Sequence, residues 1–423
     1  MAEEKNIVTK QEKKIPPVNN NGAVKGRKKF RFFSSLILIF AILLLFLTLL
    51  VSVTQTSFFR DFVKGYLVDM INEDFAKKQS SLKIGGLEGN FFSEIIITDV
   101  LLTVKQDEMI KLDKVKLNYD IFGLMNKTVE VTEAVINNPT VNFVKIPGNN
   151  GDSLFNFVYL FSSEDTTKDT SDFEWKINVK RLRLENLNFT MLGSKPEDLP
   201  VKDLKVINAP NFTTENLRIN SLTLETRAQY DKNAIQLWID HLSFRSNFGF
   251  DLKGLSGDFY ISKSRAEINK LNIETSRSWV QMQYVFIDKL DLMNVEGLPS
   301  FKGKDLRLSL VGKNFDFDDL KAFLPAVDFL NGNLFFELKA KGKFDDIIVE
   351  TCRIETPNTN MGFSGRMVNL IDPENLWFDV KSNEFRIDPV DTKRYTPGLP
   401  IPDYTHVGVV TGNVSYKGEP LNF

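Results

Sequence analysis

The residues that could support covalent or metal chemistry are few and lie far apart in the sequence. The chain has two histidines, His241 and His406, and one cysteine, Cys352, among 423 residues. Neither histidine has a Cys or His neighbour at the spacing of a zinc site. No nucleophile-elbow, phosphate-binding or dinucleotide-binding pattern occurs. We therefore expect that the protein is not an enzyme and that it has no cofactor and no metal site.

The densest acidic cluster, Asp316–Asp319, has the composition of a calcium loop but lacks its spacing. An EF-hand loop needs a glycine at its sixth position, and that position holds Lys321. Acidic residues also cap the start of helices, and this interpretation is favoured. Cys352, between Thr351 and Arg353, is predicted to be an ordinary strand residue, and a single cysteine excludes an intrachain disulfide.

Apolar side chains are the chemical groups that the sequence places most regularly. The chain has 36 phenylalanines, and from Leu82 onward apolar and polar residues alternate in many segments. Such alternation is typical of antiparallel strands with one apolar and one solvated face. We therefore expect a mainly β fold, an elongated antiparallel β-sheet groove with short helical inserts. The candidate lining residues of the apolar face are Val115, Leu117, Tyr119, Leu182, Leu184, Ile235, Leu237, Ile239, Leu306, Leu308, Leu310, Leu334, Phe336 and Leu338.

Two local patterns refine this expectation. The alternation changes phase once, between Leu182-Leu184 and Leu187-Phe189, which predicts a β-bulge. Helical patterns occur in two short inserts, Ser153–Phe161 and Asp318–Phe329.

A weak internal repeat of about 80 residues indicates stacked units that share one core. The triplet Ile273-Glu274-Thr275 returns 81 residues later as Ile354-Glu355-Thr356. The last copy begins at Thr411, close to the end of the sequence, which predicts the N-terminal piece of a longer protein. Chance recurrence is the alternative for the glycine-centred turns of this repeat, at Gly89, Gly257, Gly332 and Gly412.

The N-terminal part of the chain has the pattern of a membrane anchor. An uncharged run of 28 residues, Phe32 to Phe59, follows a basic cluster. As a helix, its apolar core to Val53 would be about 33 Å long, enough to cross a bilayer once. A cleaved signal peptide is the alternative, but such peptides have shorter apolar cores. The cluster, which would keep its side of the membrane cytoplasmic, comprises Lys25, Arg27, Lys28, Lys29 and Arg31.

We therefore expect a disordered cytoplasmic tail over residues 1–31, a transmembrane anchor over 32–55 and an amphipathic helix over 56–80. This helix either plugs the end of the following domain with its apolar face, which is favoured, or lies on the outer surface of the membrane. Its apolar residues include Phe59, Phe62, Val63, Tyr66 and Met70. The net charge of −2, with basic and acidic residues interspersed, argues against a nucleic-acid partner.

Three segments resemble proteins of the AsmA-like superfamily, most closely the N-terminal part of TamB-type proteins. In Leu82–Phe143 the shared features are a Gly-x-x-Gly turn, a strand pair that ends near Asp99-Val100 and a strand that closes on Pro139. Residues 173–189 and 316–346 resemble a later strand pair and a helix–β unit of that family. The order of these segments is the specific signal.

The resemblance implies an N-terminal β module at 81–150, a short helix and acidic linker at 151–172, and a repeating β-groove at 173–423. It also implies an inner-membrane protein whose bulk lies in the periplasm. Its partners would be phospholipids, the inner membrane and an outer-membrane barrel protein, which TamB-type members meet through a C-terminal domain that these residues do not contain.

Two functions follow as hypotheses. In the first, the groove shields lipid acyl chains during transport toward the outer membrane. In the second, the protein is a scaffold for the translocation and assembly of outer-membrane β-barrel proteins. An envelope structural protein without cargo is a third possibility, and alternation alone does not separate an open groove from a sealed core. The usual strand spacing predicts about 22–26 strands and a groove about 100–125 Å long.

Overall fold

The computed structural model describes residues 38, 40–46, 48–49, 51–148, 153–162, 174–193, 211–289, 298–370, 372 and 375–419. The chain divides into two units, Met1–Phe59 and Arg60–Phe423. The expected cytoplasmic tail, its basic cluster and the acidic linker lie outside the described residues.

The N-terminal helices do not by themselves establish a membrane span. In the part of the chain that the structure describes, no single helix is both long and apolar enough to cross a membrane. Phe40–Thr54 and Ser57–Ala76 meet the criteria of length and composition only as a bent pair. The single anchor over 32–55 therefore stays a prediction.

The described part of the second unit is mainly β. Helix α2 (Ser57–Ala76) precedes it, and short helical inserts interrupt it: α3 (Asn156–Phe161), α4 (Phe317–Lys321) and α5 (Pro389–Tyr395). The strands are β1 (Ser80–Gly89), β2 (Glu94–Val104), β3 (Asp107–Asp120), β4 (Thr128–Asn137), β5 (Thr140–Pro147), β6 (Ser153–Phe155), β7 (Lys176–Leu192), β8 (Asn216–Tyr230), β9 (Ala234–Ser246), β10 (Leu252–Ser262), β11 (Arg265–Thr275), β12 (Trp279–Asp288), β13 (Asp305–Asp316), β14 (Asn333–Lys343), β15 (Asp346–Glu355), β16 (Asn360–Val368), β17 (Trp377–Ile387) and β18 (Val410–Gly418).

These strands form one long mixed sheet, so the expectation of a purely antiparallel sheet is wrong. Strands β4 and β5 follow one another beside β3 and act as one broken strand. Both pair in parallel with β7, whereas the other pairs are antiparallel. A parallel pair requires the chain to cross back over the sheet, and β6 and α3 lie in that connection.

In the part of the chain that the structure describes, the sheet has 18 strands, fewer than the 22–26 expected. The expectation assumed short, evenly spaced strands, but β7 has 17 residues and β8 has 15. Because β4 and β5 share one level and β6 lies at the side, the strands stack in sixteen levels. At a spacing of about 4.8 Å these levels span about 70 Å.

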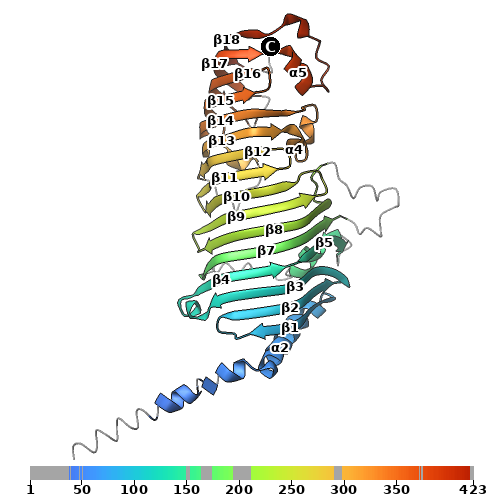
Figure 1. Ribbon diagram of the computed structural model, residues 1–423, viewed down its shortest axis with the longest axis vertical. Helices are drawn as coiled ribbons and strands as arrows, with labels where there is room; N and C mark the ends of the chain where they lie inside the picture. The colour runs from blue at the N-terminus through green and yellow to red at the C-terminus, as the bar shows by residue number, and fades with distance from the viewer. Residues whose placement is uncertain are drawn as a thin grey trace, which may run out of the picture. The chain divides into compact units, whose positions relative to one another are not determined.

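The two rims of the sheet differ. Helices α2, α3, α4 and α5 all adjoin the same ends of the strands, which we call the helical rim (Figure 1). The opposite ends are joined by short turns and by the 3-10 helices Ile121–Asn126 and Leu298–Phe301, which we call the turn rim. The predicted insert Asp318–Phe329 is interrupted, since α4 ends at Lys321 and a 3-10 turn begins at Pro325.

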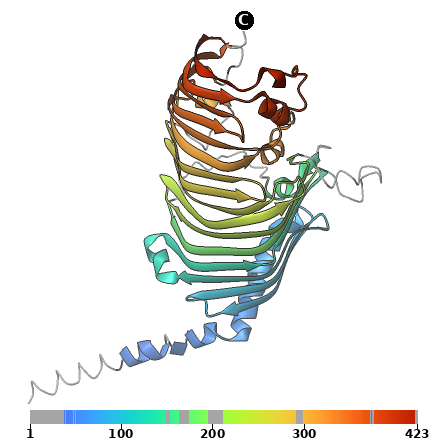
Figure 2. The ribbon, with the colours of Figure 1, turned by 45° about the horizontal axis from the view of Figure 1, so that its top comes forward.

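A line of left-handed residues bends the sheet across its first strands. Asp99, Asn138, Asn186 and Ser221 have φ values of 52°, 48°, 58° and 54°. The amide of Asn186 donates to the side-chain oxygen of Asn138 at 3.0 Å. The register shift between Leu184 and Leu187 confirms the predicted bulge. Bulges increase local twist and bend strands, and Figure 2 shows that the strands of the sheet are strongly curved.

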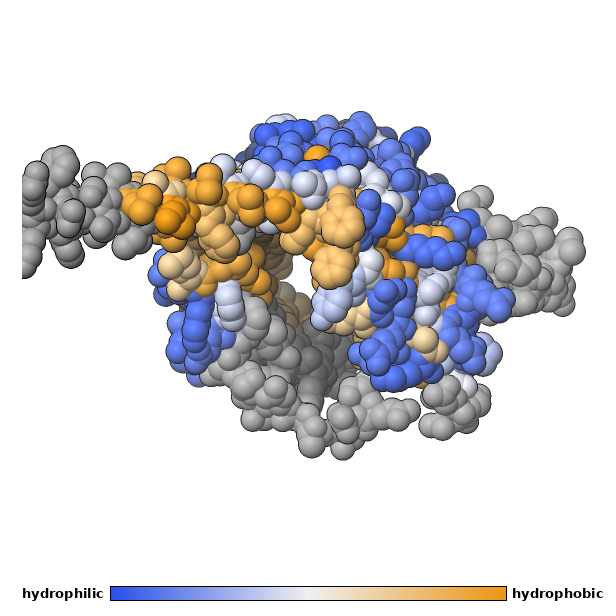
Figure 3. Space-filling model, turned by 90° about the horizontal axis from the view of Figure 1, so that it is seen from below, coloured by the Kyte–Doolittle hydropathy of each residue, from blue (hydrophilic) through white to orange (hydrophobic). Residues whose placement is uncertain are grey.

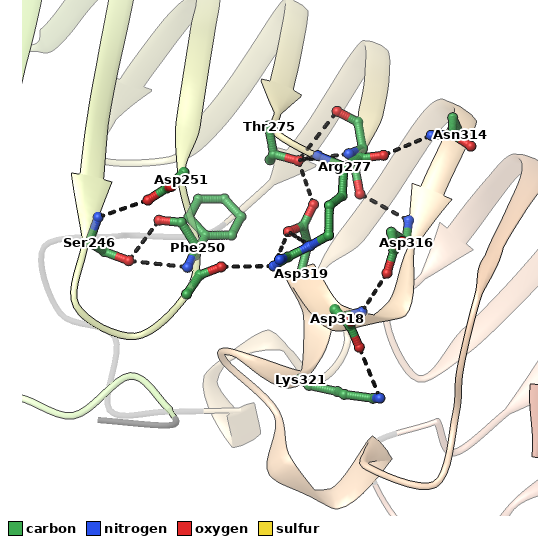
Figure 4. Close-up of polar contacts among 12 residues, drawn as sticks. Ser246, Phe250, Asp251, Thr275, Arg277, Asn314, Asp316, Asp318, Asp319 and Lys321 are labelled. Carbon is green, nitrogen blue, oxygen red and sulfur yellow. Dashed lines mark hydrogen bonds and ion pairs between the residues drawn. The ribbon is translucent and has the colours of Figure 1, made fainter. Parts of the chain in front are cut away.

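The internal repeat corresponds to a structural unit on the helical rim. Thr275 ends β11, and its hydroxyl donates to the buried carboxylate of Asp319 in α4 at 2.5 Å (Figure 4). Arg277 donates from Nε to the same carboxylate at 3.0 Å and from Nη2 to the carbonyl of Gly249 at 2.8 Å. Asp316 caps α4 by accepting from the amide of Asp318, which confirms the predicted helix cap. Helix α4 is thereby held against two preceding turns.

The second copy repeats this arrangement four strands later. Thr356, the equivalent of Thr275, donates to Asp391 of α5 at 2.5 Å, and the Asn358 amide donates to it at 2.8 Å. Burial raises the pKa of the Asp391 carboxyl, but hydrogen bonds from Thr356, Asn358 and Thr359 outweigh this effect and hold the pKa below its ordinary value of 3.8. Tyr395 at the end of α5 donates to the carbonyl of Asn333.

The glycines of the repeat do not share one role. Gly89 and Gly332 adopt positive φ values of 109° and 85° and suit turns. Gly257 and Gly412 lie inside β10 and β18, so their predicted turns are wrong. A Cβ at Gly257 would lie 3.1 Å from Leu271, which indicates close strand packing as the reason for glycine there.

We expect Asp391→Ala to lower the free energy of unfolding at pH 7 by about 1–3 kcal/mol, because it removes the buried carboxylate that accepts hydrogen bonds from Thr356 and Asn358. Urea denaturation of the detergent-solubilised chain measures the change. Asp318→Ala is the matched control. The Asp318 side chain is half exposed, and the described contact of its carboxylate is an ion pair with Lys321. Equal midpoints for the two variants would contradict the assigned role.

The contribution of Asp391 should also depend on pH. Because its pKa is lowered in the folded state, the stabilisation is present above the ordinary value of 3.8 and is lost as pH falls through the lowered pKa. The difference in stability between the native chain and Asp391→Ala should therefore shrink in acid. A difference that stays constant from pH 7 to acid would show that the carboxylate charge is not involved.

Candidate functional site

The cross-strand register brings apolar residues into rows along one face of the sheet. The first row crosses all sixteen levels without a polar residue. Its members are Leu87, Ile97, Val115, Ile136, Leu184, Leu224, Leu242, Leu255, Ile273, Val280, Gly312, Phe336, Ile354, Met361, Phe385 and Gly412. Every non-glycine member is half-buried and none is fully buried.

The predicted lining residues fall in this row and the three rows beside it. The first row contains Val115, Leu184 and Phe336, and the second contains Leu117, Leu182, Ile239, Leu310 and Leu338. The third contains Tyr119, Leu237 and Leu308, and the fourth contains Ile235 and Leu306. Leu334 lies on the same face of β14, opposite Phe315. The structure thus brings all fourteen residues to one face.

Two glycines in the first row make space for aromatic rings. Gly312 pairs with Phe336 and Gly412 pairs with Phe385. A Cβ at Gly312 would lie 2.2 Å from the Phe336 ring, and one at Gly412 would lie 3.4 Å from the Phe385 ring. The rings therefore lie over the glycine positions. The alternation pattern missed these glycines, because it scores only apolar side chains.

The apolar face lines a hollow. At its C-terminal end the structure has a cavity of about 490 Å³, lined by residues that include Phe363, Met367, Val380, Phe385 and Tyr416. In the view along the stack of strands, hydrophobic residues border the upper side of a hollow and hydrophilic residues cover much of the outside (Figure 3). The rows of half-buried apolar residues therefore face a partly open trough.

Parts of the apolar face are filled by the protein. Near β1–β5 a core of Leu102, Val104, Met109, Ile146 and Leu160 packs with the partly buried Phe75 of α2. Near β8 and β9, Phe248 and Phe250 pack with Phe323, which follows α4, at ring distances of 5.6 and 4.8 Å. These clusters lie toward the helical rim.

The opposite face of the sheet is polar and carries cross-strand ion pairs. Arg181 of β7 lies 2.8 Å from Glu225 of β8 and 3.7 Å from Glu133 of β4. Arg366 of β16 lies 2.6 Å from Asp346 of β15. Such exposed pairs contribute little stability, typically about 0–1 kcal/mol each. Charged pairs distinguish this face from the apolar rows, although Tyr284 and Ile348 are also exposed on it.

A larger hollow, of about 920 Å³, lies near the turn rim on the polar face of β11–β15. Its lining includes Arg265, Glu267, Arg307 and Lys341. Charged groups are costly to desolvate, so this hollow suits an apolar ligand poorly, although it is larger than the cavity beside Phe363 and Met367.

The residues with chemical reactivity are dispersed. Cys352 lies in β15 and in the second row, as expected for a strand residue, and burial raises the pKa of its thiol. Its side chain is half-buried. Among the described residues, no three or more His, Cys, Asp or Glu side chains are placed to hold a metal ion.

No protein-family model, curated protein or solved structure matches this chain. The apolar trough is therefore the feature on which a functional assignment must rest.

We expect Phe336→Glu to weaken binding of a fluorescent apolar dye to the purified chain by roughly tenfold or more, which corresponds to about 1.4 kcal/mol. A carboxylate in the first row would have to be desolvated by the bound dye. Phe335→Glu is the control, because Phe335 points to the opposite face, where the Arg353 guanidinium lies 5.6 Å from its ring centre. Equal affinities for the two variants would contradict binding in the trough.

Proposed function

We propose that this protein is a membrane-anchored conduit segment that shields lipid acyl chains in its apolar trough. The observation that carries the proposal is the first row, which runs through sixteen strands with only apolar or glycine residues. Within this row, a lipid acyl chain bound anywhere from β1 to β18 would contact only apolar side chains and glycines. The partial exposure of the row supports an accessible surface.

The energetics of lipid transfer favour such a surface. Exposing an acyl chain to water costs about 0.8 kcal/mol per CH₂, so a 16-carbon tail costs about 13 kcal/mol. A continuous apolar surface removes this cost without any reactive residue. The trough spans about 70 Å at the usual strand spacing, which is several times the length of one tail, so lipids would move along it stepwise.

The location that we propose is the inner membrane, with the N-terminus cytoplasmic and the bulk of the chain in the periplasm. The uncharged run Phe32–Phe59 and the basic cluster before it support this topology. The resemblance of Leu82–Phe143 to the AsmA-like superfamily supports transport toward the outer membrane.

The proposal can be tested with a photoreactive amino acid, benzoylphenylalanine, at Leu308 in the full chain in membranes. We expect crosslinks to phospholipid, because Leu308 lies in the third row of the trough. Arg307 is the matched control position, since it precedes Leu308 in β13 and is exposed. Equal lipid crosslinking at the two positions, or none at Leu308, would overturn the proposal.

A second candidate, a scaffold for outer-membrane β-barrel assembly, has one observation in its favour. Val410 and Val414 of β18, the last described strand, are exposed. An exposed apolar strand can pair with a strand from another chain. In the same experiment, crosslinks from β18 to nascent barrel proteins, with none from Leu308 to lipid, would favour the scaffold.

A further inference from the structure

Helix α2 has apolar residues on two faces. One face packs on the sheet: Lys64 donates to the carbonyl of Gly85 at 3.0 Å, and Phe75 joins the core near β1–β5. Asn72 donates to the carbonyl of Leu82 at 2.9 Å and accepts from its amide at 2.6 Å. These contacts cover the free edge of β1 and fix the rotation of α2 about its axis.

The other face presents an exposed apolar stripe. Phe58, Phe62, Tyr66 and Met70 recur at every fourth residue, and their side chains are 81%, 63%, 63% and 50% exposed. At 1.5 Å per residue the stripe is about 18 Å long. The single apolar face expected for this helix is therefore divided. Its half-buried members include Phe59 and Val63, whereas Phe62, Tyr66 and Met70 face outward.

We propose that this stripe lies in the interfacial region of the bilayer, so that α2 seats the first strands of the trough at the membrane. The bilayer is the expected contact of the stripe, because the stripe begins within the uncharged run Phe32–Phe59, which we propose to be the membrane anchor. An anchor in that run keeps the next turns of helix within reach of the lipid surface. Phenylalanine and tyrosine side chains, here Phe58, Phe62 and Tyr66, favour this interface. The inference rests on the membrane anchor of the proposed function.

The charges on α2 indicate how the stripe binds. The exposed charged residues of the helix after Arg60 are all acidic: Asp61, Asp69, Glu73 and Asp74. Asp69 and Glu73 follow Phe62 and Tyr66 by seven residues and therefore project from the same side of the helix as the stripe. Attraction of a basic patch to anionic lipids is therefore not the source of binding. Insertion of the apolar side chains is the source, so contact should be no stronger in anionic than in neutral bilayers.

The test uses the full chain with Cys352→Ser, reconstituted in phosphatidylcholine vesicles with and without phosphatidylglycerol. Nitroxide labels are placed one at a time through Phe62→Cys, Tyr66→Cys and Met70→Cys. Asp61→Cys, on the same helix but about 100–180° from the three labelled residues, and Arg307→Cys, on the polar face of β13, are the controls. Collision rates with oxygen, which concentrates in lipid, and with a water-soluble nickel complex report the surroundings of each label.

We expect labels at the stripe to collide more with oxygen and labels at the controls to collide more with nickel, in both lipid mixtures. Water-like collisions at all five positions would overturn the inference, and so would low collision rates with both reagents at the stripe, which indicate a protein partner. A label at Phe46→Cys separates the two proposals. If it reports lipid while the stripe reports water, only this inference fails, and if it reports water as well, the anchor fails.

Discussion

The trough depends on one constraint, the register of sixteen neighbouring strand levels. A slip of one residue would turn every side chain of a strand to the opposite face, so each pair must keep apolar residues opposite apolar residues. The bulges do not break this order, because the row continues from Leu184 to Leu224 past the left-handed Asn186. The same bulges bend the sheet. The bulge positions therefore bend the sheet and at the same time leave the apolar row continuous.

The rim contacts convert this sheet into linked units. Asp319 and Asp391 are buried carboxylates that each join a short helix to the preceding β-turn through a threonine. Arg277 links Asp319 of α4 to the carbonyl of Gly249, and Tyr395 of α5 donates to the carbonyl of Asn333 at the start of β14. Polar groups of one unit thus find their hydrogen-bond partners in the neighbouring unit, and the units stabilise one another as in other repeat proteins. An isolated unit would leave these groups without partners.

Sequence patterns predicted the mainly β fold, the apolar face, the bulge and the Asp316 cap, because these depend on local periodicity and short-range hydrogen bonds. They did not predict the parallel pairing of β4 and β5 with β7, which depends on the path of a connection. They overestimated the number of strands, since periodicity does not mark where a strand ends. The buried role of Asp319 was also missed: its partner Thr275 is 44 residues away.

The single parallel step reverses the direction of every later strand relative to an uninterrupted meander. Because of it, β13 and β17 run toward the same rim as β5, and α4 and α5 lie on the rim that α2 and α3 adjoin. Without that step, α4 and α5 would lie on the rim opposite α2 and α3. The two rims are consequently unequal: helices α2–α5 all adjoin one of them, and the described connections on the other are turns and 3-10 helices. In the lipid conduit that we propose, sideways exchange of lipid would meet less protein at the turn rim.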